Sequence, residues 1–391
     1  MKITFLGDMM LDADQREKYR TSDGFCFDGA FSPLRDELSE ADFIVANLET
    51  PVAGEELLFT HERYSFNAPI EFAEALKKAG VGLVTTANNH SLDRGMDGLE
   101  RTIENLDAAG LPHTGTQKEN ETRYFTKEIC GHKIGFIACT YGTNAFANGC
   151  YLPKDRKYCI NLFQEQELHG KAIRWLYQNK SFPVRAVRKV LGKLHLFQFN
   201  RPVYERREFS PRRMRAYRNA MRRLRQDGAE FIFALLHTGG QYNERPTPLT
   251  KWICRKSLAF GADCVIANHE HVVHGFDRRG MRRGRLCFYS LGNCFSSSGI
   301  TEEPFGKRSN CSAAVSVEFE RGGGRRYSIT ILSSVASPDG KITVMPMHRL
   351  ISACGDETEK RRLLDDYSAV MNAVFGTRGK AYPPKKEHVL R

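Results

Sequence analysis

The sequence lacks long apolar runs, a leader-like start and paired cysteines. No segment approaches 18 consecutive apolar residues, so no transmembrane helix is expected. The opening MKITFLGD has neither the basic start nor the long apolar core of a signal peptide. The eleven cysteines are odd in number and form no CxxC pair, which indicates reduced thiols rather than a disulfide framework. These absences predict a cytoplasmic protein without a membrane span.

Positive charge is concentrated in one segment. The formal net charge is +12, but residues 151–225 alone hold 20 Lys and Arg against 5 Asp and Glu, so the remainder is slightly acidic. Aromatic residues are interleaved with these cations, namely Trp175, Tyr177, Phe182 and Phe197. Such a segment can bind a polyanion, although a run of charge is also typical of a solvated face. No recognition motif supports nucleic acid as the partner.

Short apolar runs alternate with helical patterns from Lys2 to Gly149, which predicts an α/β architecture. Residues 151–207 lose this alternation and are interpreted as an insertion. A helix opened by Ser210 as N-cap and Pro211 restores it. Period-two runs after Asn310 then predict antiparallel strands.

The 391 residues are therefore divided into two parts. The first is one domain over residues 1–350, interrupted by the basic insertion. The second is a charged C-terminal helix and tail over residues 351–391. No internal repeat is present.

The stretch VIANHEHVVHGFD, residues 265–277, holds three of the twelve histidines. A zinc-protease helix would need a second histidine four residues after His269, where the chain has Val273. His269 and His271 are two residues apart, so a strand or extended loop would point them to the same side. They are therefore candidate ligands of one metal cluster.

Polar side chains follow the predicted strands. In an open α/β sheet, ligands gather at the carboxyl ends of the strands. Each such residue alone is typical of a turn or a core position, but their joint occurrence at six strand ends predicts a metal site. These residues are Asp8, Asn47, Glu49, Asn89, His90, His237, His269, His271 and Asn293.

The segments FLGDMML, ANLETPV, TTANNHSLDRGMDGL, HTGGQYNERPTP, GADCVIANHEHVV and YSLGN occur in this order between Lys2 and about Ser298. They resemble the successive blocks of the CapA family of capsule synthesis or poly-γ-glutamate biosynthesis proteins, which is similar to the calcineurin-like metallophosphoesterases. The resemblance skips the basic insertion. It implies a four-layer α/β/β/α sandwich of metallophosphoesterase type with two mixed β-sheets.

The resemblance also implies two divalent metal ions, Mn, Fe or Zn. Carried over residue by residue, it assigns one ion to Asp8, Glu49 and His271, and the other to Glu49, Asn89, His237 and His269.

Further roles follow from position beside these ligands. We expect His90 to protonate a leaving group or steady the transition state, with Asp93 orienting it. We expect Asn47, Arg94, Ser290 and Asn293 to line the substrate pocket.

The chain departs from the family pattern at four positions. Thr238 stands where an aromatic residue is usual, and Gln241 where an acid is usual. Ala267 replaces a glycine, and Glu270 a proline. These changes bear on substrate specificity more than on metal binding.

The leading hypothesis is a dinuclear hydrolase that uses a metal-bridging hydroxide on a phosphoester or a polyglutamate-type polymer. An anionic substrate fits the basic segment, and components of a polyglutamate synthase are the implied partners. The alternative is a non-catalytic, polymer-binding accessory subunit of a capsule or polyglutamate synthesis complex. The chain lacks the amino-terminal membrane anchor of many family members, which argues against the usual surface complex.

Overall fold

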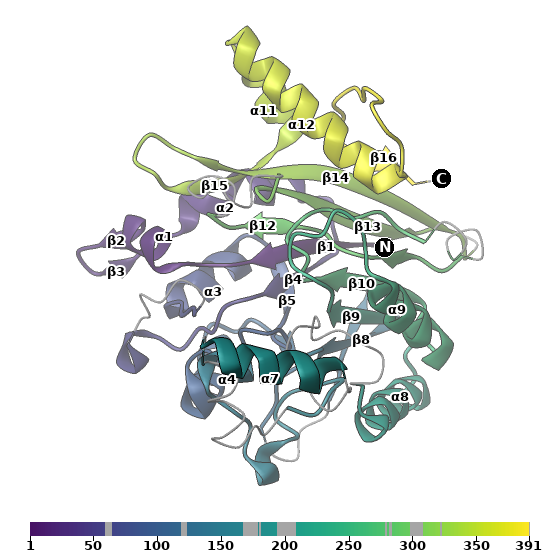
Figure 1. Ribbon diagram of the computed structural model, residues 1–391. Helices are drawn as coiled ribbons and strands as arrows, with labels where there is room; N and C mark the ends of the chain where they lie inside the picture. The colour runs from purple at the N-terminus through teal and green to yellow at the C-terminus, as the bar shows by residue number, and fades with distance from the viewer. Residues whose placement is uncertain are drawn as a thin grey trace.

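Two mixed β-sheets packed face to face form the centre of the protein (Figure 1). The computed structural model describes residues 1–58, 65–118, 123–166, 179, 181–193, 209–277, 280, 284–297, 308–320 and 323–390.

The first sheet has the strand order β15-β14-β13-β1-β4-β5-β6, with β12 beside β1 and β16 beside β14. Strands β12, β1, β4, β5 and β6 run parallel to one another, whereas β13, β14, β15 and β16 pair in antiparallel fashion. The period-two runs predicted after Asn310 are confirmed as three of these strands. The bounds are β1 (Lys2–Met9), β4 (Phe43–Leu48), β5 (Val81–Thr85), β6 (His113–Thr114), β12 (Asn293–Phe295), β13 (Cys311–Phe319), β14 (Arg325–Ala336), β15 (Ile342–Pro346) and β16 (His388–Val389).

The second sheet has the order β11-β10-β9-β8-β7. Its strands are parallel except β7, which forms an antiparallel pair with β8. Its bounds are β7 (Phe125–Ile129), β8 (His132–Thr140), β9 (Phe231–His237), β10 (Cys264–Asn268) and β11 (Cys287–Phe288), and a separate hairpin pairs β2 (Arg20–Thr21) with β3 (Gly24–Phe25).

Aromatic side chains fill the space between the sheets. The ring of Phe5 in β1 lies 4.6 Å from that of Phe233 in β9, and Phe233 stacks on Phe136 in β8 at 5.5 Å. Because side chains alternate between the two faces of a strand, the neighbours of these residues point outward to the helices. Strands that are buried on both faces explain the nearly continuous apolar runs in the sequence.

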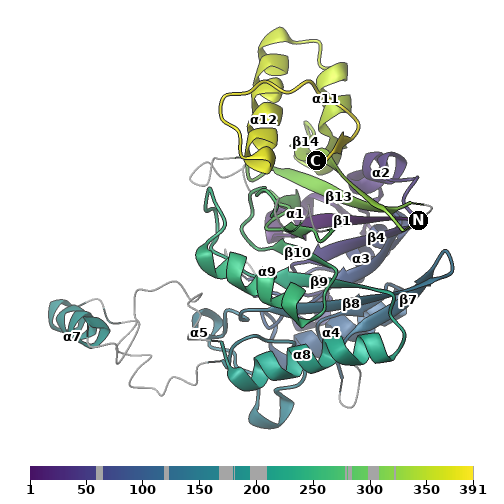
Figure 2. The same ribbon diagram turned by 90° about the vertical axis from the view of Figure 1, so that its right-hand side faces the viewer.

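Helices cover the outer face of each sheet. Phe31 of α2 and Phe72 of α3 join the cluster on the outer face of the first sheet, and Met221 of α8 and Ile253 of α9 join that of the second. The expected four-layer α/β/β/α sandwich is therefore confirmed, and Figure 2 shows α8 and α9 beside the second sheet. The helices are α1 (Ala13–Lys18), α2 (Asp28–Glu37), α3 (Ile70–Lys78), α4 (Gly95–Ala108), α5 (Ala145–Asn148), α7 (Phe182–Lys193), α8 (Pro211–Gln226), α9 (Pro248–Phe260), α11 (Met347–Ala353) and α12 (Glu357–Phe375), with short 3-10 turns η1 (Glu55–Leu57) and η2 (Lys154–Arg156).

The basic segment includes two helices of different character. Helix α8 begins as the sequence predicts, with the Arg213 N–H donating to the Ser210 side chain and Pro211 in the first turn. Figure 2 shows α7 apart from the four layers, and Phe182 at its start is 84% exposed. The interleaved aromatics Trp175, Tyr177 and Phe197 lie outside the described residues. Within the described residues, no helix combines the length and apolar composition needed to cross a membrane.

The C-terminal segment is part of the core. Tyr367 of α12 is fully buried, and β16 adds to the edge of the first sheet by pairing with β14. Helix α11 spans the expected boundary at residue 350. The division into two parts there stays a prediction.

One predicted strand is wrong. The run ending in FYSLGN forms β11 only as far as Phe288, and Asn293 instead begins β12 in the other sheet. There it pairs with Asp8 of β1. Gly292, with a φ of 73°, makes the turn between these two short strands. A residue with a side chain rarely adopts this left-handed conformation.

Gly7 permits the close contact between this turn and β1. A Cβ atom at position 7 would lie 2.0 Å from the Gly292 carbonyl oxygen, which accepts a hydrogen bond from the Asp8 N–H at 3.0 Å. We expect Gly7→Ala to lower the free energy of unfolding by about 1–3 kcal/mol or more, because backbone atoms must move apart. Equilibrium unfolding in denaturant measures this change.

Gly29→Ala is the matched control for that substitution. Gly29 lies in α2 with nothing within 4 Å of an added Cβ, so alanine should keep or slightly raise stability. An unfolding midpoint of Gly7→Ala equal to that of the wild type would contradict the tight contact.

Candidate metal centre

Buried ligand-type side chains meet where strands of both sheets end. Asp8 is the penultimate residue of β1, and His237 is the last residue of β9. Glu49 directly follows β4, and His269 directly follows β10. Asn89 and His271 follow β5 and β10 by a few residues. All six side chains are at most 2% exposed. The structure thus brings together every residue predicted as a ligand.

The Glu49 carboxylate is the centre of the cluster. Its Oε1 atom lies 3.2 Å from His237 Nε2, 3.9 Å from His271 Nε2 and 4.0 Å from His269 Nδ1. Two groups of donor atoms, each within 4.8 Å of one another, share this residue: Glu49 with His269 and His271, and Asp8 with Glu49 and His237.

These groups overlap with, but do not reproduce, the division of ligands implied by the resemblance. Asp8 Oδ2 also lies 3.5 Å from His271 Nδ1, which is the pairing expected for the first ion. For the second ion, His237 Nε2 donates to Asn89 Oδ1 at 2.6 Å. The distribution of ligands between two ions stays a prediction.

The residues present fit divalent metal ions. Among the described residues, neither Glu49 oxygen accepts a hydrogen bond, although both are buried. An orphaned buried carboxylate is costly unless a cation compensates it. Metal–ligand bonds of about 2.1 Å place neighbouring ligand atoms roughly 3–3.5 Å apart. The distance from Glu49 Oε1 to His237 Nε2 is 3.2 Å, and those to His271 and His269 are longer by less than 1 Å. Imidazole nitrogens mixed with carboxylate and amide oxygens suit Zn, Mn or Fe.

The mutual charges shift the pKa values of the acidic ligands in opposite directions. Burial and the neighbouring Glu49 charge raise the pKa of Asp8. Burial alone would also raise the pKa of Glu49, but His237 and His271 outweigh it and lower that pKa. Glu49 is therefore ionised, as a metal ligand must be.

The pKa values of two histidine ligands are also shifted in opposite directions. Burial and His237 lower the pKa of His269 well below its usual value, so its ring is neutral. For His271, burial acts in the same direction, but Glu49 and Asp8 outweigh it and raise the pKa to about 9. His271 must therefore give up a proton when it binds a cation.

Two asparagines predicted to line the substrate pocket contact the predicted ligands, and their role in substrate binding stays a prediction. Asn47 Nδ2 donates to Asp8 Oδ1 at 2.7 Å and to His237 Nδ1 at 3.2 Å, while its oxygen accepts from Thr85. His271 Nδ1 donates to Asn293 Oδ1 at 2.9 Å, which leaves Nε2 directed towards Glu49. The bond to Asn293 fixes the His271 tautomer that leaves Nε2 free, as is usual for metal-binding histidines, whereas Asn47 fixes the positions of Asp8 and His237.

The expected extended conformation of the His-x-His segment is wrong. His269 has a φ of 103° and His271 a φ of 57°, so both residues adopt left-handed backbone conformations. Residues without the freedom of glycine pay roughly 1–3 kcal/mol for such conformations, which cluster at functional sites. The two rings nevertheless converge, with centroids 5.7 Å apart.

Two tyrosines that support these histidines were missed from the sequence. The Tyr141 ring lies 4.8 Å from that of His269, and the Tyr242 ring 5.2 Å from that of His271. Tyr141 directly follows β8, so its place at a strand end was the signal that could have found it.

His90 and Asp93 form a buried pair beside the ligands. His90 Nδ1 lies 2.7 Å from Asp93 Oδ2, and the carboxylate also accepts from the Phe66 N–H and the Asn148 side chain. Burial would lower the pKa of His90, but the Asp93 charge and hydrogen bond outweigh it and raise the pKa. The pair therefore favours a charged imidazole that can donate a proton.

Other predicted positions take structural contacts. Arg94 donates to the Ser65 hydroxyl, and the Ser290 hydroxyl accepts from the Gly292 N–H at 3.3 Å. Glu270, which replaces the family proline, is buried, and burial raises its pKa to about 8. A Cβ atom at Gly239 would lie 2.2 Å from its carboxylate, so Glu270 packs tightly against the loop after β9.

Two curated relatives are similar to this chain over most of its length. The capsule biosynthesis protein CapA of Bacillus anthracis is 23% identical over 313 residues, which cover 77% of this chain and 61% of the relative. The PGA biosynthesis protein CapA of Bacillus subtilis strain 168 is 20% identical over 341 residues, covering 84% of this chain and 70% of the relative. The chain thus spans less than two thirds of the length of the first relative.

Among solved structures, a Thermus thermophilus sulfate thiohydrolase SoxB aligns with a TM-score of 0.40 and 12% sequence identity, covering 86% of this chain and 46% of that one. The family model described as bacterial capsule synthesis protein PGA_cap matches residues 2–298. These residues include every member of the metal cluster. The protein therefore belongs to the bacterial capsule synthesis family PGA_cap.

Proposed function

We propose that this chain is a dinuclear metal-dependent hydrolase that acts on a phosphoester or on a polyglutamate-type polymer. The observation that carries the proposal is the Glu49 carboxylate, which is fully buried, accepts no hydrogen bond from a described residue and is shared by two groups of donor atoms. One ion is assigned to Asp8, Glu49 and His271, and the other to Glu49, Asn89, His237 and His269. A scaffold protein has no need to bury this set.

The chemistry follows from the residues around the cluster. Two bound divalent ions would lower the pKa of a water molecule and neutralise charge on the oxygens of the reacting group. His90, held through Nδ1 by Asp93 at 2.7 Å, has its Nε2 side available to give a proton to the leaving group. Asn47 and Asn293 keep Asp8, His237 and His271 oriented throughout.

An anionic polymer is the substrate class that the charge distribution favours. Helix α8 buries Tyr217, Met221 and Leu224, so most of its arginines remain on the outer face. A concentrated positive field attracts a polyanion and raises its local concentration. The family description and the name of the Bacillus subtilis relative point to capsule and PGA biosynthesis, so polyglutamate is the polymer we propose.

The proposed partners are components of a polyglutamate synthase. The proposed compartment is the cytoplasm, supported by eleven free cysteines, most of which are buried inside strands and helices. Thiols that persist without disulfides are typical of a reducing compartment.

The first prediction from this proposal concerns metal content. We expect wild-type protein to carry two divalent ions per chain by elemental analysis, and a His269→Ala, His271→Ala double variant to lose most of them. His132→Ala, which changes an exposed histidine paired with Glu230, is the control and should keep both ions. Circular dichroism checks that each variant is folded. Fewer than one ion per wild-type chain would exclude the dinuclear centre.

The second prediction separates proton donation from metal binding. We expect His90→Gln to keep its metal and to lower turnover by about 10²–10⁴-fold on a substrate with a poor leaving group. The loss of turnover should be much smaller on a nitrophenyl ester, because its nitrophenolate leaving group departs without being protonated. Asp93→Asn should show the same pattern more weakly. Equal losses on both substrates, or loss of metal, would assign His90 a structural role instead.

The third prediction concerns the reaction itself. Metal-loaded protein should hydrolyse a generic phosphoester or shorten polyglutamate, as measured by phosphate release and by size-exclusion chromatography. The His269→Ala, His271→Ala variant should do neither. A full metal complement with no turnover on either substrate would favour the accessory, polymer-binding role.

A further inference from the structure

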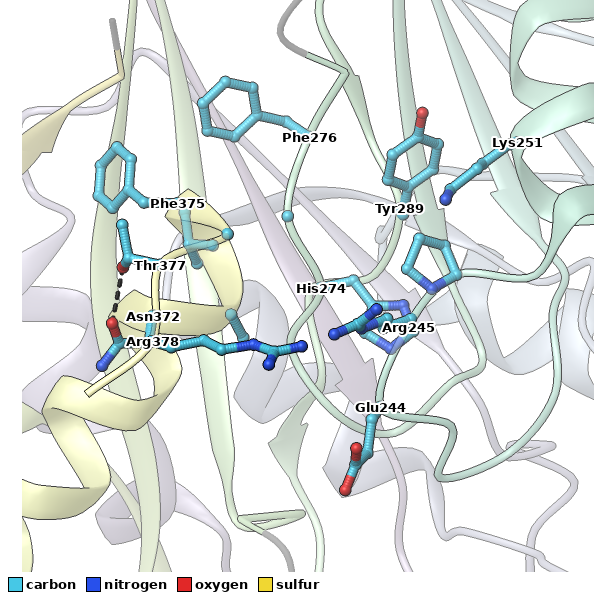
Figure 3. Close-up of a pocket in the computed structure, with 15 residues that line it drawn as sticks. Glu244, Arg245, Lys251, His274, Phe276, Tyr289, Asn372, Phe375, Thr377 and Arg378 are labelled. Carbon is cyan, nitrogen blue, oxygen red and sulfur yellow. Dashed lines mark hydrogen bonds between the residues drawn. The ribbon is translucent and has the colours of Figure 1, made fainter. Parts of the chain in front are cut away.

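A second cavity lies apart from the metal cluster. Its volume is about 500 Å³, and none of the six predicted ligands lines it. Its walls are the loop from Glu244 to Pro246, the segment around His274, Tyr289 after β11, and the C-terminal end of α12 (Figure 3). Helix α12 lies outside the residues that match the family model, so this chain builds half of the cavity from its own C-terminal segment.

Three cationic side chains line this cavity, namely Arg245, Lys251 and Arg378. None of them forms an ion pair with a described residue. Figure 3 shows Arg378 extending from the α12 side towards the wall formed by Arg245 and His274, whereas the Glu244 carboxylate points away from them. Three cations against the single acid Glu244 give the cavity an excess of positive charge, which favours an anion.

Aromatic rings form the other part of the lining. Phe276 and Tyr289 are largely buried, and the Phe276 ring lies 6.2 Å from that of Phe375 at the end of α12. Figure 3 shows Phe276 and Phe375 on one side of the cavity and Tyr289 beside Lys251. A ligand must therefore combine negative charge with a flat or apolar part.

His274 forms a neutral part of the cavity wall. Its Nε2 donates to the Asn243 carbonyl oxygen at 2.7 Å, which makes Nδ1 an acceptor. Nδ1 is buried and has no partner among the described residues. Burial lowers the pKa of His274 to about 4, so the ring stays neutral near pH 7. A buried, neutral imidazole adds no charge to the wall, so the positive charge of the lining comes from the three cations.

We propose that this cavity binds a nucleoside phosphate. The phosphates meet Arg245, Lys251 and Arg378, and the base packs against the aromatic lining formed by Phe276, Tyr289 and Phe375. The volume lies within the range of about 300–1,000 Å³ that is usual for small-molecule sites. A purely aliphatic polyanion would leave the aromatic rings without a stacking partner.

The cavity borders the metal centre through one loop. Tyr242 packs against His271, Asn243 accepts from His274, and the next two residues line the cavity. The nucleotide site is nevertheless separate from the cluster, so its occupancy does not depend on metal binding or on the proposed hydrolase activity.

Calorimetric titration of the full metal-loaded chain with the methylene analogue of ADP, which resists hydrolysis, tests the proposal. We expect saturable binding that Arg245→Gln combined with Arg378→Gln weakens by roughly tenfold or more. Arg361→Gln is the control for each of the two substitutions made singly, since it removes one positive charge from an exposed position of α12 outside the cavity. Phe375→Ala should weaken the ADP analogue more than it weakens inorganic tripolyphosphate.

Three results would overturn the nucleotide site. The first is no saturable binding to the wild type. The second is loss of binding with His271→Ala but not with the two cavity arginine variants, which would locate the nucleotide at the metal centre. The third is binding of inorganic tripolyphosphate or a short oligoglutamate as tight as that of the nucleotide, which would assign the rings no role. None of these results bears on the metal content predicted above.

Discussion

The burial of two neighbouring carboxylates, Asp8 and Glu49, is the constraint on which the rest of the structure depends. Taking one charge out of water costs several kcal/mol even after the protein relaxes. Here burial and the Glu49 charge raise the pKa of Asp8, so the pair is unfavourable without nearby positive charge. Histidines supply part of it, and the unsatisfied Glu49 oxygens leave room for cations to supply the remainder.

The packing of the two sheets makes this concentration of ligands possible. Parallel strands in each sheet end at one edge, and face-to-face packing brings the end of β1 next to the ends of β9 and β10. The contact between Gly7 and Gly292 brings β12 against β1, so Asn293 can reach His271. The left-handed conformations of His269 and His271 complete the convergence. The packing and hydrogen bonding of the two sheets thus offset the free-energy cost of the strained backbone at these two histidines.

Helix α12 gives this chain a feature that the family region alone does not supply. Its apolar face, with Tyr367 fully buried, anchors it to the core, so its C-terminal end can form a fixed wall of the second cavity. The loop after β9 forms the opposite wall and also supports His271 through Tyr242. This loop therefore borders two regions of different chemistry. One is rich in buried carboxylates and imidazoles, and the other in aromatic rings and in cations that form no ion pair with a described residue.

The sequence alone determined the α/β class, the N-cap of α8 and the late antiparallel strands, because each leaves a local signal in periodicity or capping. Position at strand ends indicated nine candidate donors, and the resemblance to the CapA family selected the six that the structure brings together. Only the tertiary structure decided that Asn293 begins a strand of the other sheet, and that Asn47 and Asn293 hold ligands. It also decided that His274 faces a separate cavity with Arg378. These facts depend on contacts between residues 20 to more than 200 positions apart. Local structural propensity and residue spacing do not predict such long-range contacts.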